Sequence, residues 1–171
     1  MGTDLPPAHA RAAATTRRYR EAVEAGDAET FLATLAPNVA LHSPITTRTQ
    51  FRGHDEIRAL MHAVFASIEE TRYFEDVGNA TTRALFYRAR VGRQEVEEAT
   101  LVRLDADALV TEIRLWFRPL PGLTAAMGRL GPELAREQGR TRGALLVALT
   151  APLVAATRAG DRLAVSLLRR S

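Results

Sequence analysis

The side chain best suited to acid–base chemistry in this sequence is Glu98. It lies in a strand-like segment, residues 94–105, where it shares one face with Val96 and Val102. A carboxyl group among apolar side chains has a raised pKa, which suits it to exchanging protons near neutral pH. The alternative is that Glu98 joins the neighbouring Glu97 in a solvated rim.

Other kinds of chemistry lack the residues they need. The chain has no cysteine and no lysine, which excludes thiolate ligands and Schiff-base catalysis by a lysine. Its four histidines, His9, His42, His54 and His62, form no pair with metal-ligand spacing. There is no nucleophile elbow, P-loop or dinucleotide fingerprint, so we expect neither a metal nor a cofactor.

The charge is divided unevenly along the chain. Residues 1–120 carry 15 arginines and 17 acidic residues, whereas residues 121–171 carry 8 arginines and 3 acidic residues. The high isoelectric point therefore belongs to the tail, and the main part has no basic surface for nucleic acid. The N-terminus lacks the apolar segment of a secretory signal, so a cytoplasmic location is the expectation.

The residue patterns predict helices followed by strands. Helices are expected at about 10–25, 27–37 and 53–68, a short strand at 39–43 and a loop at 45–52. Four more strands are expected at about 72–78, 82–91, 94–105 and 109–118. This order predicts an α+β fold with the helices on one face of a curved sheet.

The tail begins at the rigid break Arg118-Pro119-Leu120-Pro121-Gly122. It is expected to form helices at about 123–138, 141–158 and 161–169. The segment ALLVALTAPLVAAT is apolar on every side, which favours burial. It could cover the mouth of the domain, seal the outer face of the sheet, exchange with a partner or lie on an anionic membrane surface. We therefore divide the chain into an arm (1–9), a domain (10–118) and a helical extension (119–171).

Residues 10–118 resemble the NTF2-like superfamily, which includes ketosteroid isomerase and the SnoaL-type polyketide cyclases. The resemblance is carried by RRYREAVEAGDAETFLATLAPNVALHSP and FRGHDEI, and by LVRLDADALVTEIRLWFRP sixty residues or so further along. It implies a cone of three N-terminal helices packed on a curved, mainly antiparallel sheet. It also implies an apolar pocket for a small hydrophobic molecule, and a homodimer formed through the outer face of the sheet, where Arg114 and Trp116 are expected.

The resemblance, combined with strand alternation, suggests which residues face the pocket. They are Tyr19, Ser43, Leu60, Met61, Glu98, Thr100, Ile113, Leu115 and Phe117. Tyr19 matches the oxyanion-hole tyrosine of ketosteroid isomerase. Ser43 stands at the position of that family's aspartate base, and Thr100 at the position of its second oxyanion-hole acid. Met61 stands at the position of its supporting tyrosine.

Two hypotheses follow. In the first, the protein is an isomerase- or cyclase-type acid–base catalyst, with Glu98 as the proton shuttle and Tyr19, Ser43 and Thr100 placing or polarising a carbonyl. In the second, it is a non-catalytic module that binds a lipophilic ligand, a protein or a membrane surface. The carboxylates of ketosteroid isomerase and of limonene-epoxide hydrolase are absent at the matching positions, so neither of those two reactions is expected.

Overall fold

Helices packed on one face of a curved sheet form the main body of the protein, which confirms the predicted α+β class. The computed structural model describes residues 7–48, 50–136 and 140–168. The helices are α1 (Pro7–Ala25), α2 (Ala28–Leu32), α3 (Gly53–Ser67), α4 (Leu120–Arg136) and α5 (Arg140–Leu168). The strands are β1 (Leu35–His42), β2 (Gln50–Arg52), β3 (Glu69–Gly78), β4 (Thr82–Val91), β5 (Gln94–Leu104) and β6 (Val110–Arg118).

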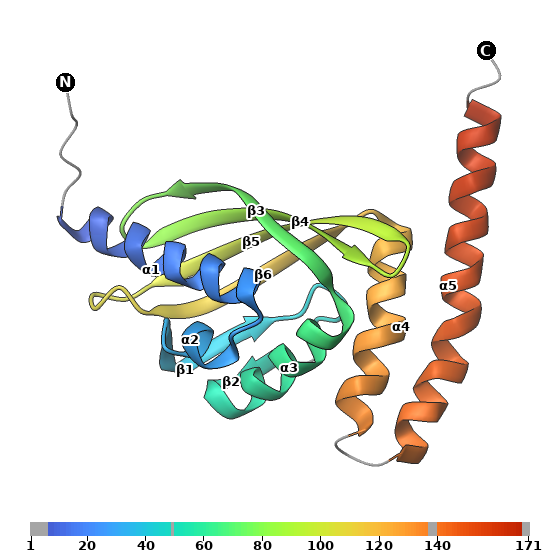
Figure 1. Ribbon diagram of the computed structural model, residues 1–171, viewed down its shortest axis with the longest axis horizontal. Coiled ribbons are helices and arrows are strands. Elements are labelled where there is room, and N and C mark those ends of the chain that lie inside the picture. The colour runs from blue at the N-terminus through green and yellow to red at the C-terminus, as the bar shows by residue number, and fades with distance from the viewer. Residues whose placement is uncertain (1–6, 49, 137–139, 169–171) are drawn as a thin grey trace.

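The six strands form one sheet in the order β2-β1-β6-β5-β4-β3. Only the β1–β6 pair is parallel among the described strands, and the other neighbours are antiparallel. The sheet curls around α1 and α3, and α4 stands at its open end (Figure 1). Strand β2 lies where a loop was predicted, because three residues at a sheet edge carry too little alternation to be recognised.

Local signals set where the first helices begin and end. Gly26 adopts a positive φ of 69°, a conformation that ends α1 and that glycine tolerates best. The next residue, Asp27, caps α2 by accepting a 3.0 Å hydrogen bond from the backbone N–H of Thr30. This tight turn sends the chain back across α1, so that Phe31 reaches the core.

The core lies between the helices and the concave face of the sheet. On β5, alternate residues from Val96 to Leu104 are buried, as predicted. On β6, Ile113 is fully buried while Arg114 and Trp116 are exposed, so the predicted inner and outer faces of this strand are also confirmed. The largest fully buried side chains include Phe31, Ile57 and Leu85.

A buried carboxylate ties α1 to the far edge of the sheet. The Oδ2 of Asp76 accepts a 2.8 Å hydrogen bond from the hydroxyl of Thr16 on α1. Its Oδ1 accepts a 2.8 Å hydrogen bond from Nε of Arg83, whose side chain is also buried. The Arg20 guanidinium lies 3.4 Å away. Both charges are thus withdrawn from water and depend on each other for compensation.

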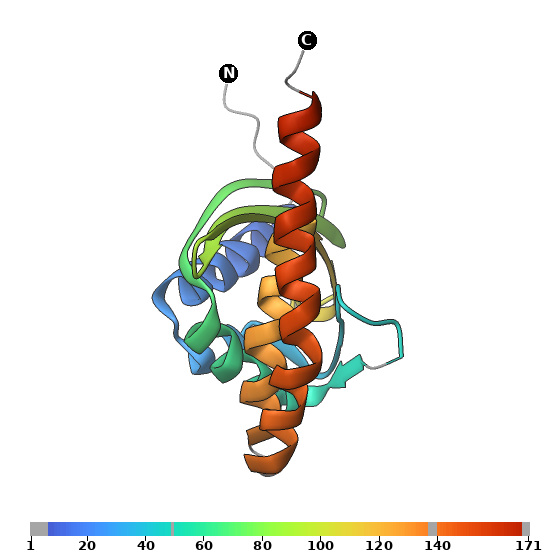
Figure 2. The ribbon, with the colours of Figure 1, turned by 90° about the vertical axis from the view of Figure 1, so that its right-hand side faces the viewer.

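The tail differs from its prediction in two ways. Residues 140–168 form one continuous helix with no break near 160, since a single glycine inside a helix costs only about 1 kcal/mol. The described part of the segment expected to be buried, residues 148–157, is covered on one side only within this chain, with Leu149 and Leu153 open to solvent. The cause is that, among the described residues, α5 packs mainly against α4 and extends past the rest of the molecule (Figures 1 and 2).

Helix α4 is fixed to the sheet at its first turn. Gly122 lies so close to Val96 of β5 that a Cβ at this position would collide with the valine side chain. Thr124 and Ala126, on the following turn, are buried. Helix α4 therefore has a close backbone contact with the sheet at one end.

Replacing Asp76 by alanine should lower the free energy of unfolding by about 3 kcal/mol, because Arg83 would remain buried without its partner. Urea denaturation followed by circular dichroism measures this. The exposed neighbour provides a matched control, and Glu75→Ala should change stability by less than about 0.5 kcal/mol. Equal effects of the two substitutions would contradict the assignment.

Candidate functional site

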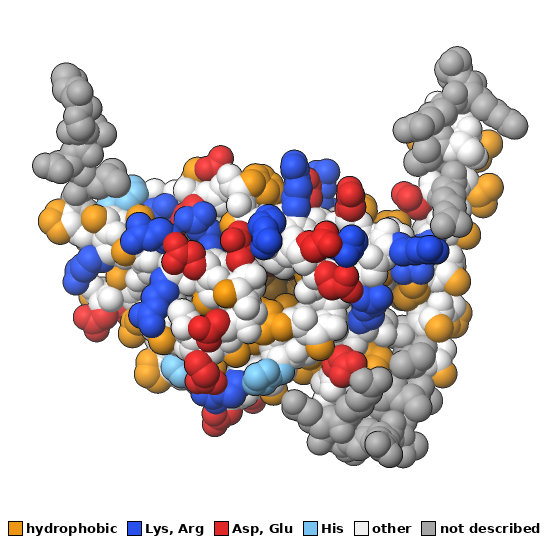
Figure 3. Space-filling model, in the orientation of Figure 1, with side chains coloured by type: hydrophobic (Ala, Val, Ile, Leu, Met, Phe, Trp, Pro, Cys, Tyr) orange, Lys and Arg blue, Asp and Glu red, His pale blue; other side chains and the backbone are white. Residues whose placement is uncertain are grey.

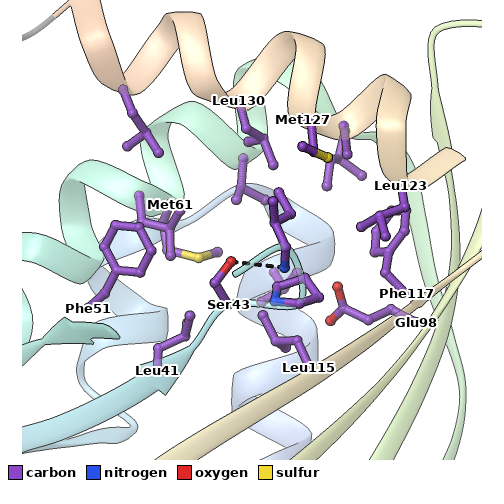
Figure 4. A pocket seen from close by; sticks show the side chains of 18 of the residues that line it. Leu41, Ser43, Phe51, Met61, Glu98, Leu115, Phe117, Leu123, Met127 and Leu130 are labelled. Atoms are coloured by element: carbon purple, nitrogen blue, oxygen red, sulfur yellow. Dashed lines mark hydrogen bonds between the residues drawn. The ribbon is translucent and has the colours of Figure 1, made fainter. Parts of the chain in front are cut away.

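A cavity of about 360 Å³ lies inside the cone. It is bordered by α1 and α3, by the inner face of β5 and β6, and by α4 at the open end of the sheet (Figure 4). Its wall is mostly apolar, with Leu41, Phe51, Met61, Leu115 and Phe117 among the contributing side chains. A concave, mainly apolar space with a few polar groups is the usual form of a small-molecule site.

Helix α4 provides one wall of this cavity. Leu123, Met127 and Leu130 point from the helix into the space, and Leu134 completes the row (Figure 4). These residues repeat at spacings of three and four, which places them on one face of α4. The extension beyond β6 is therefore part of the cavity wall.

Among the described residues, Glu98 is the only charged side chain on the cavity wall. It is 7% exposed, and its carboxylate accepts two hydrogen bonds. The hydroxyl of Tyr87 donates to Oε2 and the hydroxyl of Thr100 donates to Oε1, each at 2.8 Å. These two donors hold the carboxylate in one orientation at the edge of the cavity.

Burial has the larger effect on the acidity of Glu98. Removal from water raises the pKa of Glu98 to about 7, although the hydrogen bonds from Thr100 and Tyr87 oppose the rise. Near neutral pH both the carboxylate and the carboxylic acid are therefore populated. A group of this kind can accept a proton and return it within one reaction cycle.

Three tyrosines lie near this carboxyl group, of which Tyr19 and Tyr87 are buried and Tyr73 is partly buried. Burial is the main reason that the pKa of Tyr19, of Tyr73 and of Tyr87 lies above its usual value, and the negative charge of Glu98 adds to the rise in each case. All three phenols therefore keep their protons at neutral pH and can act as hydrogen-bond donors. Tyr73 and Tyr87 contact each other edge to face, with ring centroids 5.2 Å apart.

Most of the residues predicted to face the pocket reach the cavity. Those on its wall are Tyr19, Ser43, Leu60, Met61, Glu98, Leu115 and Phe117. Two do not reach it. Thr100 lies behind the wall, where its hydroxyl is used by Glu98, and Ile113 is fully buried in the core beneath the cavity.

Ser43 stands directly after the end of β1 and lines the cavity (Figure 4). Its hydroxyl oxygen accepts a 3.1 Å hydrogen bond from the backbone N–H of Ile45. This local turn holds the residues 43–46 against the cavity. The hydroxyl proton of Ser43 is still available for donation to a bound molecule.

The sequence analysis missed Tyr73, Tyr87 and the wall formed by α4. Tyr87 could have been found, because it alternates with Leu85 and Ala89 on β4 and all three are buried. The β4–β5 register places Tyr87 directly opposite Glu98. No comparable pattern indicates that α4 turns back over the cone, since that depends on packing between distant segments.

The outer face of the sheet carries the two residues predicted for an interface. Trp116 is 55% exposed, and Arg114 beside it is paired with Glu112. The described part of the tail leaves Trp116 open to solvent. A dimer through this face stays a prediction.

The described residues form neither a metal site nor a membrane-spanning helix. Within the described ranges, no three histidine, cysteine, aspartate or glutamate side chains come together as a metal site. No described helix combines the length and apolarity needed to cross a bilayer. On the face in Figure 3, arginines and acidic side chains are intermixed, without a large area of one sign.

Solved structures with this fold include enzymes and proteins without an assigned role. A steroid delta-isomerase from Pseudomonas aeruginosa is 23% identical, with a TM-score of 0.65 over 80% of this chain and 96% of that one. A protein of cystatin-like fold from Silicibacter pomeroyi is 25% identical, with a TM-score of 0.67 over 75% of this chain and 88% of that one. A protein from Jannaschia sp. CCS1, assigned as a SnoaL-like polyketide cyclase, is 18% identical, with a TM-score of 0.60 over 73% and 97%.

These similarities confirm the NTF2-like fold that the sequence predicted. No curated protein matches the chain. A family model for the SnoaL-like domain matches residues 16–113, from the middle of α1 to the middle of β6. The match covers more than half of the chain and includes Tyr19, Ser43, Tyr87 and Glu98. The chain therefore belongs to the SnoaL-like domain family.

Proposed function

We propose that the cavity binds a small, mainly apolar carbonyl compound and that Glu98 moves a proton on it, in an isomerase- or cyclase-type reaction without a cofactor. The observation that carries this proposal is the environment of Glu98. A single carboxyl group stands on an otherwise largely apolar wall, oriented by two hydroxyl donors, with a pKa near 7. Such tuning is typical of catalytic acids and bases.

The proposed reaction uses only groups on the cavity wall. Ionised Glu98 takes a proton from the carbon next to the carbonyl of the bound compound, and the electrons of that C–H bond move onto the carbonyl oxygen. The neutral Tyr19 hydroxyl, which is also on the wall, donates a hydrogen bond to this developing enolate oxygen. Protonated Glu98 then returns the proton to another carbon of the compound. Alternatively, the enolate carbon forms a bond to a second carbonyl carbon and closes a ring, and the oxygen of that carbonyl takes the proton from Glu98. The product is therefore an isomer of the bound compound.

Tyr87 and Thr100 are positioning residues in this scheme. Their hydroxyls donate hydrogen bonds to the two carboxylate oxygens and stabilise the ionised form of Glu98. Burial therefore raises the pKa of Glu98 less than it would without these two donors. The role proposed earlier for Thr100, polarising a carbonyl, does not fit its place behind the wall.

A second candidate function is the binding and carriage of a lipophilic molecule without catalysis. It is favoured by the apolar lining and by Ser43, which occupies the position of the aspartate base in ketosteroid isomerase and has no basicity near neutral pH. In that case Glu98 would only anchor a polar end of the ligand. The two functions differ in whether a proton leaves the bound compound.

Exchange of α-hydrogens for deuterium tests the proposal without knowledge of the natural substrate. A panel of one- and two-ring ketones is incubated with the protein in D₂O and followed by NMR. We expect Glu98→Gln to slow protein-catalysed exchange by at least about 100-fold, because the base is lost. Ketone affinity, measured by calorimetry, should change by no more than about 3-fold, since the shape of the wall is kept.

Glu97→Gln is the matched control, because Glu97 is adjacent in sequence but pairs with arginines on the other face. The Glu97→Gln protein should catalyse deuterium exchange at the wild-type rate. Exchange that survives in Glu98→Gln would eliminate Glu98 as the base. Ketone binding without any exchange in the wild type would establish the carrier function instead.

The stability of the protein should also depend on Glu98 and on pH. The pKa of Glu98 is raised on folding, so its contribution is fully present below the unfolded pKa and is lost as pH rises through about 7. Relative to Glu98→Gln, the wild type should lose about 3 kcal/mol of unfolding free energy between about pH 5 and pH 8. Urea titrations at several pH values measure the difference.

Thr100→Val provides an internal check, because it removes one donor to the carboxylate. The fall in stability should then move to higher pH. A pH-independent difference between wild type and Glu98→Gln would show that Glu98 ionises as freely as a solvated carboxyl group.

A further inference from the structure

Helix α5 carries an apolar stripe that the described part of its own chain does not cover. Its members are separated alternately by four and three residues, which keeps them on one side of the helix. They are Leu149, Leu153, Ala156, Gly160, Leu163 and Leu167, called the α5 stripe below, and all six are exposed. The four leucines are 64%, 44%, 62% and 66% exposed in that order.

The α5 stripe is separate from the face that packs on α4. That face is marked by Thr157, whose hydroxyl lies 2.8 Å from the hydroxyl of Thr124, and by Val154 beside Gly128. Hydrophobic side chains are visible along the outer edge of α5 in Figure 3. An apolar surface of several hundred Å², the order expected for four leucines on one helix, marks an interaction site on a soluble protein.

The order of residues in the α5 stripe is symmetric about Arg158. Leu149 and Leu167 each lie nine residues from it, Leu153 and Leu163 each lie five, and Ala156 and Gly160 each lie two. Two copies of α5 related by a twofold axis at this level would therefore match leucine with leucine along an antiparallel pair. Isologous interfaces require this kind of self-complementarity.

We infer that the α5 stripe is a homodimer interface in which α5 of one subunit pairs antiparallel with α5 of a second copy. Leu149 then contacts the partner's Leu167, and Leu153 contacts the partner's Leu163. Ala156 meets the partner's Gly160 at the centre. The space that a side chain would occupy at Gly160 is empty for 4 Å, so nothing obstructs close approach of the two backbones there.

The shape of the molecule favours the antiparallel arrangement. The C-terminal half of α5 projects beyond the rest of the protein, whereas the half before it lies along α4 (Figures 1 and 2). In an antiparallel pair, the half of α5 that lies along α4 in one copy packs against the projecting half of α5 in the other copy. The same contact occurs at both ends of the interface. Leu163 and Leu167, which nothing in their own described chain covers, are then buried at both ends.

The charges near the α5 stripe favour a protein partner over a membrane. Between residues 148 and 168 the charged residues are Arg158, Asp161 and Arg162 alone. Arg158 and Asp161 fall on other sides of the helix from the stripe, at the 100° per residue of an α-helix. The net charge over this span is only +1, whereas helices that bind anionic membranes carry a strongly basic polar face.

Sedimentation equilibrium of the full chain tests the interface. We expect a dimer whose dissociation constant rises by about 100-fold or more in Leu163→Glu/Leu167→Glu, because each dimer would bury four carboxylates in place of four leucines. Leu168→Glu is the matched control, since Leu168 is 80% exposed but lies off the stripe. It should leave the dissociation constant unchanged.

Trp116→Glu distinguishes this dimer from one formed through the outer face of the sheet. A wild-type monomer, a dimer that survives in the double variant, or a dimer dissociated by Trp116→Glu would each overturn the inference. So would a monomeric protein that binds phosphatidylglycerol vesicles through the α5 stripe.

Cysteine cross-linking tests the orientation, even if the charged variant folds poorly. The chain has no cysteine, so each introduced thiol is the only one. Leu149→Cys and Leu167→Cys chains, mixed and oxidised, should form a mixed disulfide dimer, while Leu149→Cys alone should not cross-link. Cross-linking of Leu149→Cys with itself would show a parallel pair and overturn the antiparallel assignment.

Discussion

The register between β4 and β5 is the constraint on which the candidate site depends. It places Tyr87 directly opposite Glu98, and both side chains point to the inner face of the sheet. A shift of one residue would turn Glu98 outward and leave the phenol of Tyr87 buried without its acceptor. The polar pair and the apolar core around it therefore specify the same alignment of the strands.

The cavity wall is formed by residues inside and outside the part of the chain that matches the family model. The SnoaL-like domain provides the sheet, α1 and α3, and with them Tyr19 and Glu98. Helix α4 lies outside the matched residues, yet it provides a full apolar wall through Leu123, Met127 and Leu130. Glu98 thus belongs to the family domain, while α4 contributes to the shape of the cavity in front of it. Relatives that share the domain but not the helix would not share the volume or the outline of this cavity.

Much of the fold could be predicted because period-two alternation and helix-ending signals are local. Gly26 ends α1 by its own conformational freedom, and the inward direction of Glu98 follows from its neighbours on β5. Alternation predicts which face of the sheet a side chain lies on, but not how deeply that side chain is buried. Ile113 was therefore placed on the cavity wall, although it lies in the core below the cavity. The apolar segment of α5 shows the other limit. Its composition indicates a need for burial, but the covering surface is a matter of tertiary or quaternary structure.

The contact of Gly122 with Val96 has a consequence for how a ligand reaches the cavity. Because the first turn of α4 has no room to slide over β5, we expect any displacement of the helix to be larger at its opposite end. That end carries Leu134, and the loop at residues 43–46 also borders the cavity. We expect molecules to enter and leave between these two segments. The residence time of a bound compound would then be governed by the bending of α4 about its anchored turn, and not by the depth of the cavity alone.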